Sequence, residues 1–359
     1  MVTRRGLLAG LLATGILPRL SWADAGNPAF LSAARRADGA HILAGISPTG
    51  DILFRLPLPG RGHAGAAHPT LPQALAFARR PGTFALVLNC VTGEQTARLD
   101  APEGRHFYGH GAFSSDGSRL YTTENDYDAA RGVIGIWDVA AGYRRIGEWD
   151  SHGIGPHELL RLPGSDTLVI ANGGIETHPD SGRAKLNIPT MQPSLVYLSP
   201  EGALIDQLTL PPELHQNSIR HIAARADGTV AFAMQWQGSN TAHPPLLGLH
   251  RTGQPPQLLT AQDPDHRSLQ GYAGSTAFST DGTRVAITSP RGGLIQQFDT
   301  DGTFLSSLTA PDICGLGPGP DGFTATSGTG ALYATQALTL MQQATHPLAW
   351  DNHLTPIPA

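Results

Sequence analysis

The sequence predicts an all-β protein, a single seven-bladed β-propeller closed by strands from both chain ends in one shared blade. Three observations support this prediction. The 359 residues include 43 glycines and 29 prolines but only 15% charged residues, a composition that disfavours long helices. Short apolar runs alternate with Asp-Gly or equivalent turns, which are strong hairpin signals. The repeating unit starts near residues 63, 110, 157, 221, 275 and 315, and spacings of about 40 to 64 residues suit four-stranded blades.

The first 25 residues are typical of a signal peptide. Residues 3–8 spell TRRGLL, a twin-arginine motif, residues 6–17 are mostly apolar, and residues 23–25 spell the cleavage signal ADA. The alternative is a general secretion signal that contains two arginines by chance. We therefore expect export by the twin-arginine pathway to the periplasm, with residues 26–359 forming the single mature domain.

The first blade is expected to be divided between the two ends of the chain. Residues 30–36, 41–46 and 51–58 supply three strands, and residues 348–358 supply the missing innermost strand. This closure leaves no free sheet edge in the blade. In the alternative arrangement, residues 30–36 form the innermost strand and the C-terminus takes an outer position, which also gives seven blades.

The other six blades follow from the repeat. Residues 110–138 and 275–305 are its clearest copies, because each contains a first strand, an Asp-Gly turn and further apolar strands. The longest connection, residues 173–193, contains three prolines and is expected to form an ordered excursion beside one blade.

Charge and hydropathy limit the partners. The formal net charge is −5, and no cluster of Lys and Arg is long enough to follow a phosphate backbone, so nucleic acid is not an expected partner. Beyond the N-terminus no 18-residue window is uninterruptedly apolar, so we expect no membrane span after signal removal. A monomer is expected.

Histidines recur at one position of the innermost strands. Counting six residues back from each first turn, and aligning the C-terminal strand with the others, places five of the 15 histidines in equivalent positions: His63, His110, His157, His221 and His353. This position lies at the start of the strand, where we expect the mouth of the central channel. Imidazole is a common neutral metal ligand, so the pattern predicts a site for iron or another transition metal, or for a small ligand. The alternative is that these histidines only join neighbouring blades.

Polar residues, most of them in the loops between second and third strands, are expected around the same mouth. The rim candidates are Arg79, Glu124, Asn125, Asn172, Glu176, Arg220 and Arg291. A glutamate there would complete an iron site or act as a general base, and arginines would hold a carboxylate or phosphate. His106 and His152 precede their inner strands and are expected to support the site from behind.

Several stretches resemble an uncharacterised family of twin-arginine-exported bacterial propellers. They are RHFYGHG at 105–111, YTTENDY at 121–127, SHGIGPHE at 151–158, ANGGIETHP at 171–179 and WDNH at 350–353. The family has no established activity. Its genes commonly lie beside those of imelysin-type iron-uptake proteins, so the resemblance implies a periplasmic role in iron acquisition.

Three functions remain open from the sequence. The first is a metal- or ligand-binding propeller that assists iron uptake. The second is an enzyme, either a metal-dependent hydrolase or lactonase or an oxidoreductase, which requires a carboxylate beside the metal. The third is a platform that docks imelysin-type proteins.

Overall fold

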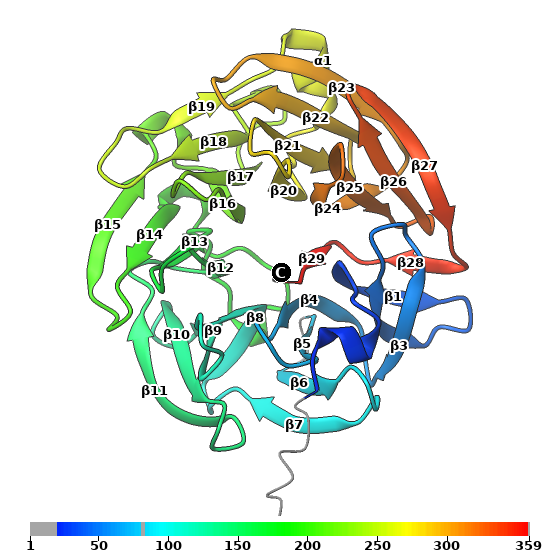
Figure 1. Cartoon of the computed structure of the whole chain (residues 1–359). Helices are drawn as coiled ribbons and strands as arrows, with labels where there is room; N and C mark the ends of the chain where they lie inside the picture. The colour runs from blue at the N-terminus through cyan, green and yellow to red at the C-terminus, as the bar shows by residue number, and fades with distance from the viewer. Residues whose placement is uncertain (1–19, 80–82, 358–359) are drawn as a thin grey trace, which may run out of the picture.

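A computed structural model describes residues 20–79 and 83–357. Within these ranges, seven antiparallel sheets surround a central axis and each extends outward from an inner strand (Figure 1). The predicted seven-bladed propeller is therefore confirmed. The twin-arginine motif lies outside the described residues. No helix in the described ranges is long and apolar enough to cross a membrane.

The strands of each blade follow one another outward from the axis. Blade 1 contains β28 (Leu348–Trp350), β29 (Thr355–Pro356), β1 (Phe30–Arg36), β2 (His41–Ile46) and β3 (Ile52–Leu58). Blade 2 contains β4 (Gly62–Ala67), β5 (Gln73–Ala78), β6 (Phe84–Asn89) and β7 (Gln95–Asp100). Blade 3 contains β8 (Arg105–Phe113), β9 (Arg119–Asp126), β10 (Arg131–Asp138) and β11 (Arg144–Asp150). Blade 4 contains β12 (Pro156–Arg161), β13 (Leu168–Asn172), β14 (Ser194–Leu198) and β15 (Leu204–Thr209).

The remaining blades have the same order. Blade 5 contains β16 (Asn217–Ala224), β17 (Val230–Trp236), β18 (Leu247–His250) and β19 (Gln257–Leu259). Blade 6 contains β20 (Ser275–Phe278), β21 (Arg284–Ser289), β22 (Leu294–Asp299) and β23 (Phe304–Thr309). Blade 7 contains β24 (Ile313–Gly319), β25 (Gly322–Ser327), β26 (Ala331–Gln336) and β27 (Thr339–Thr345). The described helices are short: η1 (Trp22–Ala25), η2 (Pro179–Ser181), η3 (Ile188–Thr190), η4 (Pro212–Leu214) and α1 (Asp263–Ser268).

The two ends of the chain close blade 1 as expected. Strand β1 pairs with β28 through Ala34 and Trp350 and with β29 through Phe30 and Pro356. Both C-terminal strands lie on the inner side of β1, so the alternative with β1 innermost is wrong.

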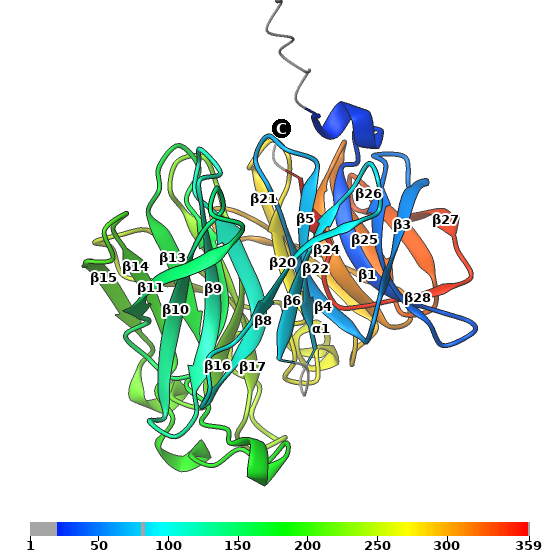
Figure 2. The ribbon, with the colours of Figure 1, turned by 90° about the horizontal axis from the view of Figure 1, so that it is seen from below.

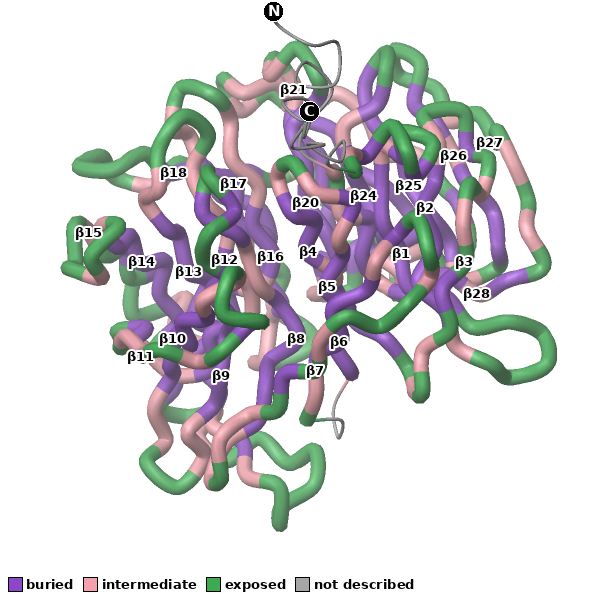
Figure 3. Tube along the Cα trace, turned by 60° about the horizontal axis from the view of Figure 1, so that its bottom comes forward, coloured by how far each residue is buried: buried purple, intermediate pink, exposed green. Residues whose placement is uncertain are grey.

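The apolar core is divided among the blade interfaces. The described residues form seven buried clusters, and each joins two neighbouring blades. Val169 of blade 4 and Phe232 of blade 5, for example, belong to one cluster. The three inner strands of each blade are accordingly buried along most of their length, and exposed residues collect in the loops and in outermost strands such as β7, β15 and β27 (Figure 3). This arrangement accounts for the low content of charged residues.

The two ends of the propeller carry different loops (Figure 2). The turns that join first and second strands lie at one end, together with η1. The excursion 173–193 and α1 lie at the other end. The excursion is ordered, because Asn187 accepts a hydrogen bond from the Glu176 amide at 2.8 Å and donates one to the Gly174 carbonyl at 2.9 Å.

The segment 22–25 packs onto the propeller although we expected it to belong to the signal peptide. Trp22 is buried, and its Nε1 donates a hydrogen bond to the His68 carbonyl at 2.9 Å. Both Trp22 and Ala25 join the apolar cluster between blades 1 and 2. Packing therefore begins a few residues before the expected domain boundary at residue 26.

Candidate metal centre

Five histidines from five consecutive blades converge on the axis. Their ring centroids lie 4.6 Å apart for His63 and His353, 4.6 Å for His110 and His353, and 4.8 Å for His157 and His221. We call these five residues the histidine ring. Four come from the inner strands β4, β8, β12 and β16, and His353 comes from the segment between β28 and β29. The predicted register therefore does bring the five side chains together.

Irregularities in the inner strands aim these side chains at the axis. The pairing register shifts between Phe107 and Gly111 in β8, between Pro156 and Glu158 in β12, and at the matching place in β4 and β16. A β-bulge of this kind adds a residue to one strand and redirects its side chain. Gly109 in β8 has a φ of +102°, and a Cβ there would lie 2.5 Å from Cδ2 of His63. Only glycine fits this close approach.

Burial keeps the ring neutral. The pKa values of all five imidazoles are lowered, mainly by burial and further by the charges of neighbouring histidines and arginines. For His221 and His353 the pKa falls to about 3. A neutral imidazole has one nitrogen with a free lone pair, which is the form that binds metals.

Four of the five side chains have a buried ring nitrogen without a hydrogen-bond partner in the described structure: His63 Nδ1, His110 Nε2, His157 Nδ1 and His353 Nε2. The ring histidines form two groups in which the ligand atoms all lie within 4.8 Å of one another. His63, His110 and His353 form one group, and His110, His157 and His221 form the other. His110 belongs to both. The arrangement therefore offers two overlapping sets of three nitrogen ligands.

Glu158 adds a carboxylate that the sequence analysis missed. Its Oε2 accepts hydrogen bonds from His221 Nδ1 at 3.0 Å and from the Ile222 amide at 3.3 Å, and its Oε1 lies 3.7 Å from His110 Nδ1. Burial raises the pKa of this carboxyl to about 7. The missed signal is an acidic residue directly after a ring histidine in an inner strand. The bulge at this point of β12 places both side chains at the ring.

A cavity of about 940 Å³ extends from the ring toward the turns between first and second strands. His110, His221, His353 and Glu158 line one end of it, and turn residues such as Asp281 line the other. We expected the histidines to border the opposite mouth, where the inner strands start. That expectation is incomplete. The ring is buried inside the channel, with the strand-start mouth on one side of it and this cavity on the other. The volume is in the range of small-molecule sites.

Three arginines among the rim candidates lie at the end where the inner strands start. Arg79 donates to Asp351 Oδ1 at 3.1 Å, and Arg220 Nε donates to Ser218 Oγ at 2.8 Å. The guanidinium of Arg291 covers the Tyr272 ring, with 4.5 Å from Cζ to the ring centroid. The charges of Arg79 and Arg220 contribute to the lowered pKa values of ring histidines, so both lie near the ring.

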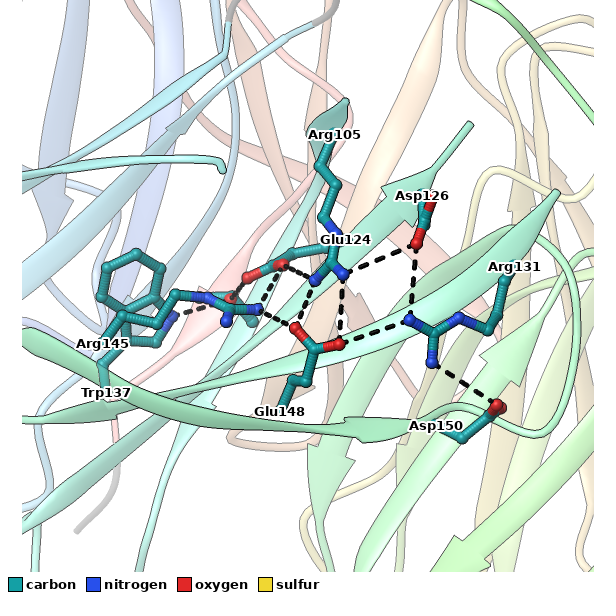
Figure 4. Close-up of polar contacts among 9 residues, drawn as sticks. Arg105, Glu124, Asp126, Arg131, Trp137, Arg145, Glu148 and Asp150 are labelled. Carbon is teal, nitrogen blue, oxygen red and sulfur yellow. Dashed lines mark hydrogen bonds and ion pairs between the residues drawn. The ribbon is translucent and has the colours of Figure 1, made fainter. Parts of the chain in front are cut away.

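Glu124 is not at the rim. It is fully buried on the flat face of blade 3, where Arg145 Nη2 lies 2.9 Å and Arg105 Nη1 3.6 Å from its Oε2 (Figure 4). Residues alternate between the two faces of a sheet, and Glu124 of β9 lies on the face where Arg145 of β11 and Arg105 of β8 also lie. Gly135 of β10 provides the space, since a Cβ there would lie 1.9 Å from Glu124 Oε1. The expected role beside a metal is therefore wrong for this residue.

The remaining rim candidates, Asn125, Asn172 and Glu176, contact neighbouring loop segments or lie in them. Asn125 donates to the Thr177 carbonyl and contacts His106 Nε2, and Asn172 bonds Ser151 through both ends of its amide. Glu176 is half-buried in the excursion.

The two histidines expected behind the site are not in the ring. His106 lies beside Tyr108 and Tyr127, with ring centroids 5.3 and 6.1 Å away. His152 is exposed in a turn with a φ of +54°.

Comparisons with known proteins agree with the fold. The solved structure titled "Kuenenia stuttgartiensis Hydrazine Synthase" is 14% identical, with a TM-score of 0.57 over 86% of this chain and 90% of that chain. A crystal structure of RRP9 WD40 repeats is 15% identical, with a TM-score of 0.56 over 92% and 94%. A structure of U3-55K is 15% identical, with a TM-score of 0.58 over 93% of each chain. At these identities the likeness shows the fold alone.

A comparison with curated proteins found no match. The family model described as "Protein of unknown function (DUF1513)" matches residues 56–357, which is most of the chain. The chain belongs to the DUF1513 family.

Proposed function

We propose that the protein binds a transition-metal ion in the histidine ring, and that this ion is iron handled during iron acquisition. One observation carries the proposal: four buried ring nitrogens have no hydrogen-bond partner in the described structure. A buried polar atom left unpaired costs about 1–3 kcal/mol, so four at one place need a compensating ligand. A metal ion would satisfy several of them at once.

The donor chemistry selects the class of metal. The ring offers neutral imidazoles, and Glu158 beside it offers a carboxylate. Nitrogen-rich sites of this kind suit iron, zinc, copper and nickel rather than magnesium or calcium. When bound, the metal would supply Lewis acidity or redox chemistry. The chain's own contribution is to keep the imidazoles neutral and to hold them in a register set by the bulges.

Metal titration of single-histidine variants tests the site. His110 belongs to both groups of ligands, so His110→Ala should lower the affinity for Fe(II), measured anaerobically by calorimetry, at least about tenfold. His41→Ala is the matched control, because His41 of β2 belongs to neither group. Zn(II) and Cu(II) are titrated in parallel, since Cu(II) binds most such sites more tightly than Fe(II) does.

Two results would overturn the metal site. One is a wild-type protein that binds none of the three metals at stoichiometric concentration. The other is a folded His110→Ala variant with unchanged affinity, with folding checked by thermal unfolding. If His110→Ala does not fold, His63→Gln and His157→Gln, one from each group, give an independent reading.

A metal-dependent hydrolase or oxidoreductase is the second candidate, because Glu158 and the histidines line one end of a cavity of about 940 Å³. A carboxylate beside a metal is what such an enzyme needs. It predicts turnover of small esters or lactones, or of a redox substrate, by the metal-loaded protein. Turnover should fall in Glu158→Gln, and its absence from wild type would count against this candidate.

We also propose a periplasmic location and transfer of iron to or from imelysin-type proteins. The support is the TRRGLL motif and the family resemblance. Replacing Arg4 and Arg5 by lysine should leave the protein in the cytoplasm, as measured by cell fractionation. Export of that variant at the wild-type level would contradict the twin-arginine pathway, and failure to cross-link with a co-expressed imelysin-type protein would contradict the partner.

A further inference from the structure

Four cations gather at the end of the channel opposite the cavity. They are Arg79, directly after β5, Arg220 in β16, Arg291, two residues after β21, and Lys185, the only lysine of the chain. They come from four different blades, 2, 5, 6 and 4. We call them the cationic mouth.

Contacts with Tyr272 and Gln237 hold two of these cations in place. Arg291 covers the ring of Tyr272, and Lys185 Nζ donates to Gln237 Oε1. Arg79, Arg220 and Arg291 all act on the pKa of Tyr272, opposing the rise that burial causes. The charges of Arg220 and Arg291 also help burial to lower the pKa of Lys185. The pairing of the strands agrees with this. Ser218, which accepts from Arg220, pairs with Gln235, and Gln235 forms a bridge with Tyr272. Gln237, the partner of Lys185, donates to the Gln235 carbonyl.

Negative charge at this mouth is scarce. Asp351 is buried and accepts from Arg79 at 3.1 Å and from Arg61 at 2.5 Å, so it is already shared by two cations. In the described part of the chain, no carboxylate lies within ion-pair distance of Lys185 or Arg291. A protein with a net charge of −5 thus concentrates positive charge at one place.

The cationic mouth borders the histidine ring. Arg220 directly precedes His221 in β16, and Arg79 donates to Asp351, two residues before His353. The charges of the two arginines also help to lower the pKa of His63, His157 and His353. The cavity toward the turns lies on the other side of the ring and is lined mostly by small and apolar residues. The two sides of the ring therefore present different chemistry to a ligand.

We propose that the cationic mouth binds a small anion that carries carboxylate or phosphate groups, directly over the histidine ring. Arginine guanidinium groups bind such planar or tetrahedral oxyanions through paired N–H donors, and the lysine adds a point charge. The anion relieves the repulsion among the four cations. This proposal goes beyond the metal site and does not need it, although an anion bound here would meet a metal held in the ring.

Anion titration of the metal-free protein tests the proposal. Citrate and inorganic phosphate are titrated separately by calorimetry at low ionic strength, and the stronger of the two identifies the preferred group. We expect binding that weakens as NaCl is added, because salt screens the attraction. The double variant Arg220→Gln/Arg291→Gln should lose at least about tenfold in affinity, and Lys185→Gln should lose about threefold.

The controls separate this site from general charge effects and from the metal site. Arg55→Gln removes one exposed arginine from β3 and should leave anion affinity unchanged. His41→Ala, outside the histidine ring, should also leave it unchanged. Lys185 is exposed, so its variant remains informative if the double arginine variant fails to fold.

Two outcomes would overturn the anion site: no binding of either anion at millimolar concentration in low salt, or equal binding by wild type and by a folded variant of the mouth. Anion binding without metal binding would instead overturn only the proposed function.

Discussion

Two buried glutamates illustrate, at the scale of single residues, how surroundings set the role of a carboxyl. Glu158 is bordered by histidines, and burial raises its pKa to about 7. Glu124 also has a raised pKa because of burial, but Arg145 and Arg105 oppose the rise. Glu148 nearby is bonded to Arg105, which lowers its pKa to about 2. The first carboxyl belongs to a site that can change its proton content, and the other two belong to a permanent ion-pair cluster.

The cluster around Glu124 is expected to act on stability alone. Removing one partner of a buried ion pair leaves the other charge uncompensated and costs about 3–5 kcal/mol. We therefore expect Glu124→Gln, which keeps the shape but removes the charge opposite Arg145, to lower the free energy of unfolding in urea by about 2–4 kcal/mol. Fe(II) affinity should stay at the wild-type value.

Exposed Glu94→Gln serves as the control for that variant. Its free energy of unfolding should change by less than about 0.5 kcal/mol. A Glu124→Gln variant that remains as stable as wild type but binds metal less well would contradict this prediction and would show that Glu124 contributes to the metal site.

At the scale of elements, the sequence predicts the hairpin turns, because contacts between neighbouring residues determine them. In the turn after β8, Ser114 Oγ donates to Asp116 Oδ1 at 2.7 Å and Gly117 has a φ of +71°. The turn after β20 repeats these contacts with Ser279 and Asp281. Such turns identify each hairpin from a few neighbouring residues, and they also set the count that aligned the ring histidines.

The direction of the remaining site side chains depends on longer-range features. Asn172 and Glu124 lie in the second strands of their blades. Alternation places Glu124 on the blade face, and Asn172 forms hydrogen bonds with Ser151. Glu158 reaches the ring because of a bulge, which shows only as a shift in pairing with a neighbouring strand. The cationic mouth joins residues from four blades, so no local pattern could have added Lys185 to the predicted arginines.

At the scale of the whole molecule, the ring closure places the histidines in a low-dielectric centre. Seven blade interfaces, each with its own apolar cluster, hold the inner strands around the axis. The C-terminal segment supplies His353 as the last member of the ring, and Ser32 Oγ of β1 donates to its carbonyl at 2.8 Å. The candidate site is therefore complete only when the first and last strands of the chain have met. The lowered pKa values of the ring histidines therefore exist only in the closed propeller.

The closed ring predicts steep loss of stability in acid for the metal-free protein. The folded state keeps five histidines neutral, with pKa values of about 3 for His221 and His353, whereas the unfolded chain takes up protons at its histidines near pH 6.5. Stability conferred by a lowered pKa is present above the unfolded pKa and is lost as the pH falls toward the folded one. Each such histidine contributes up to about 1.4 kcal/mol per pH unit. Glu158 offsets the effect of one histidine between about pH 7 and 4.5. Its raised pKa lets the folded state take up a proton in this range before the unfolded chain does.

The net effect of four protons gives a limiting slope of roughly 5 kcal/mol per pH unit between about pH 6 and 4.5. Urea unfolding at several pH values across this range measures the slope. In the variant His63→Gln/His353→Gln two of the neutral imidazoles are gone, so the slope should fall to about half. Bound Fe(II) should move the loss of stability to lower pH, because the metal binds only the folded, neutral ring. A slope that is the same in wild type and the double variant would mean that the ring exchanges protons in the folded state, and the neutral imidazoles on which the metal site depends would then be absent.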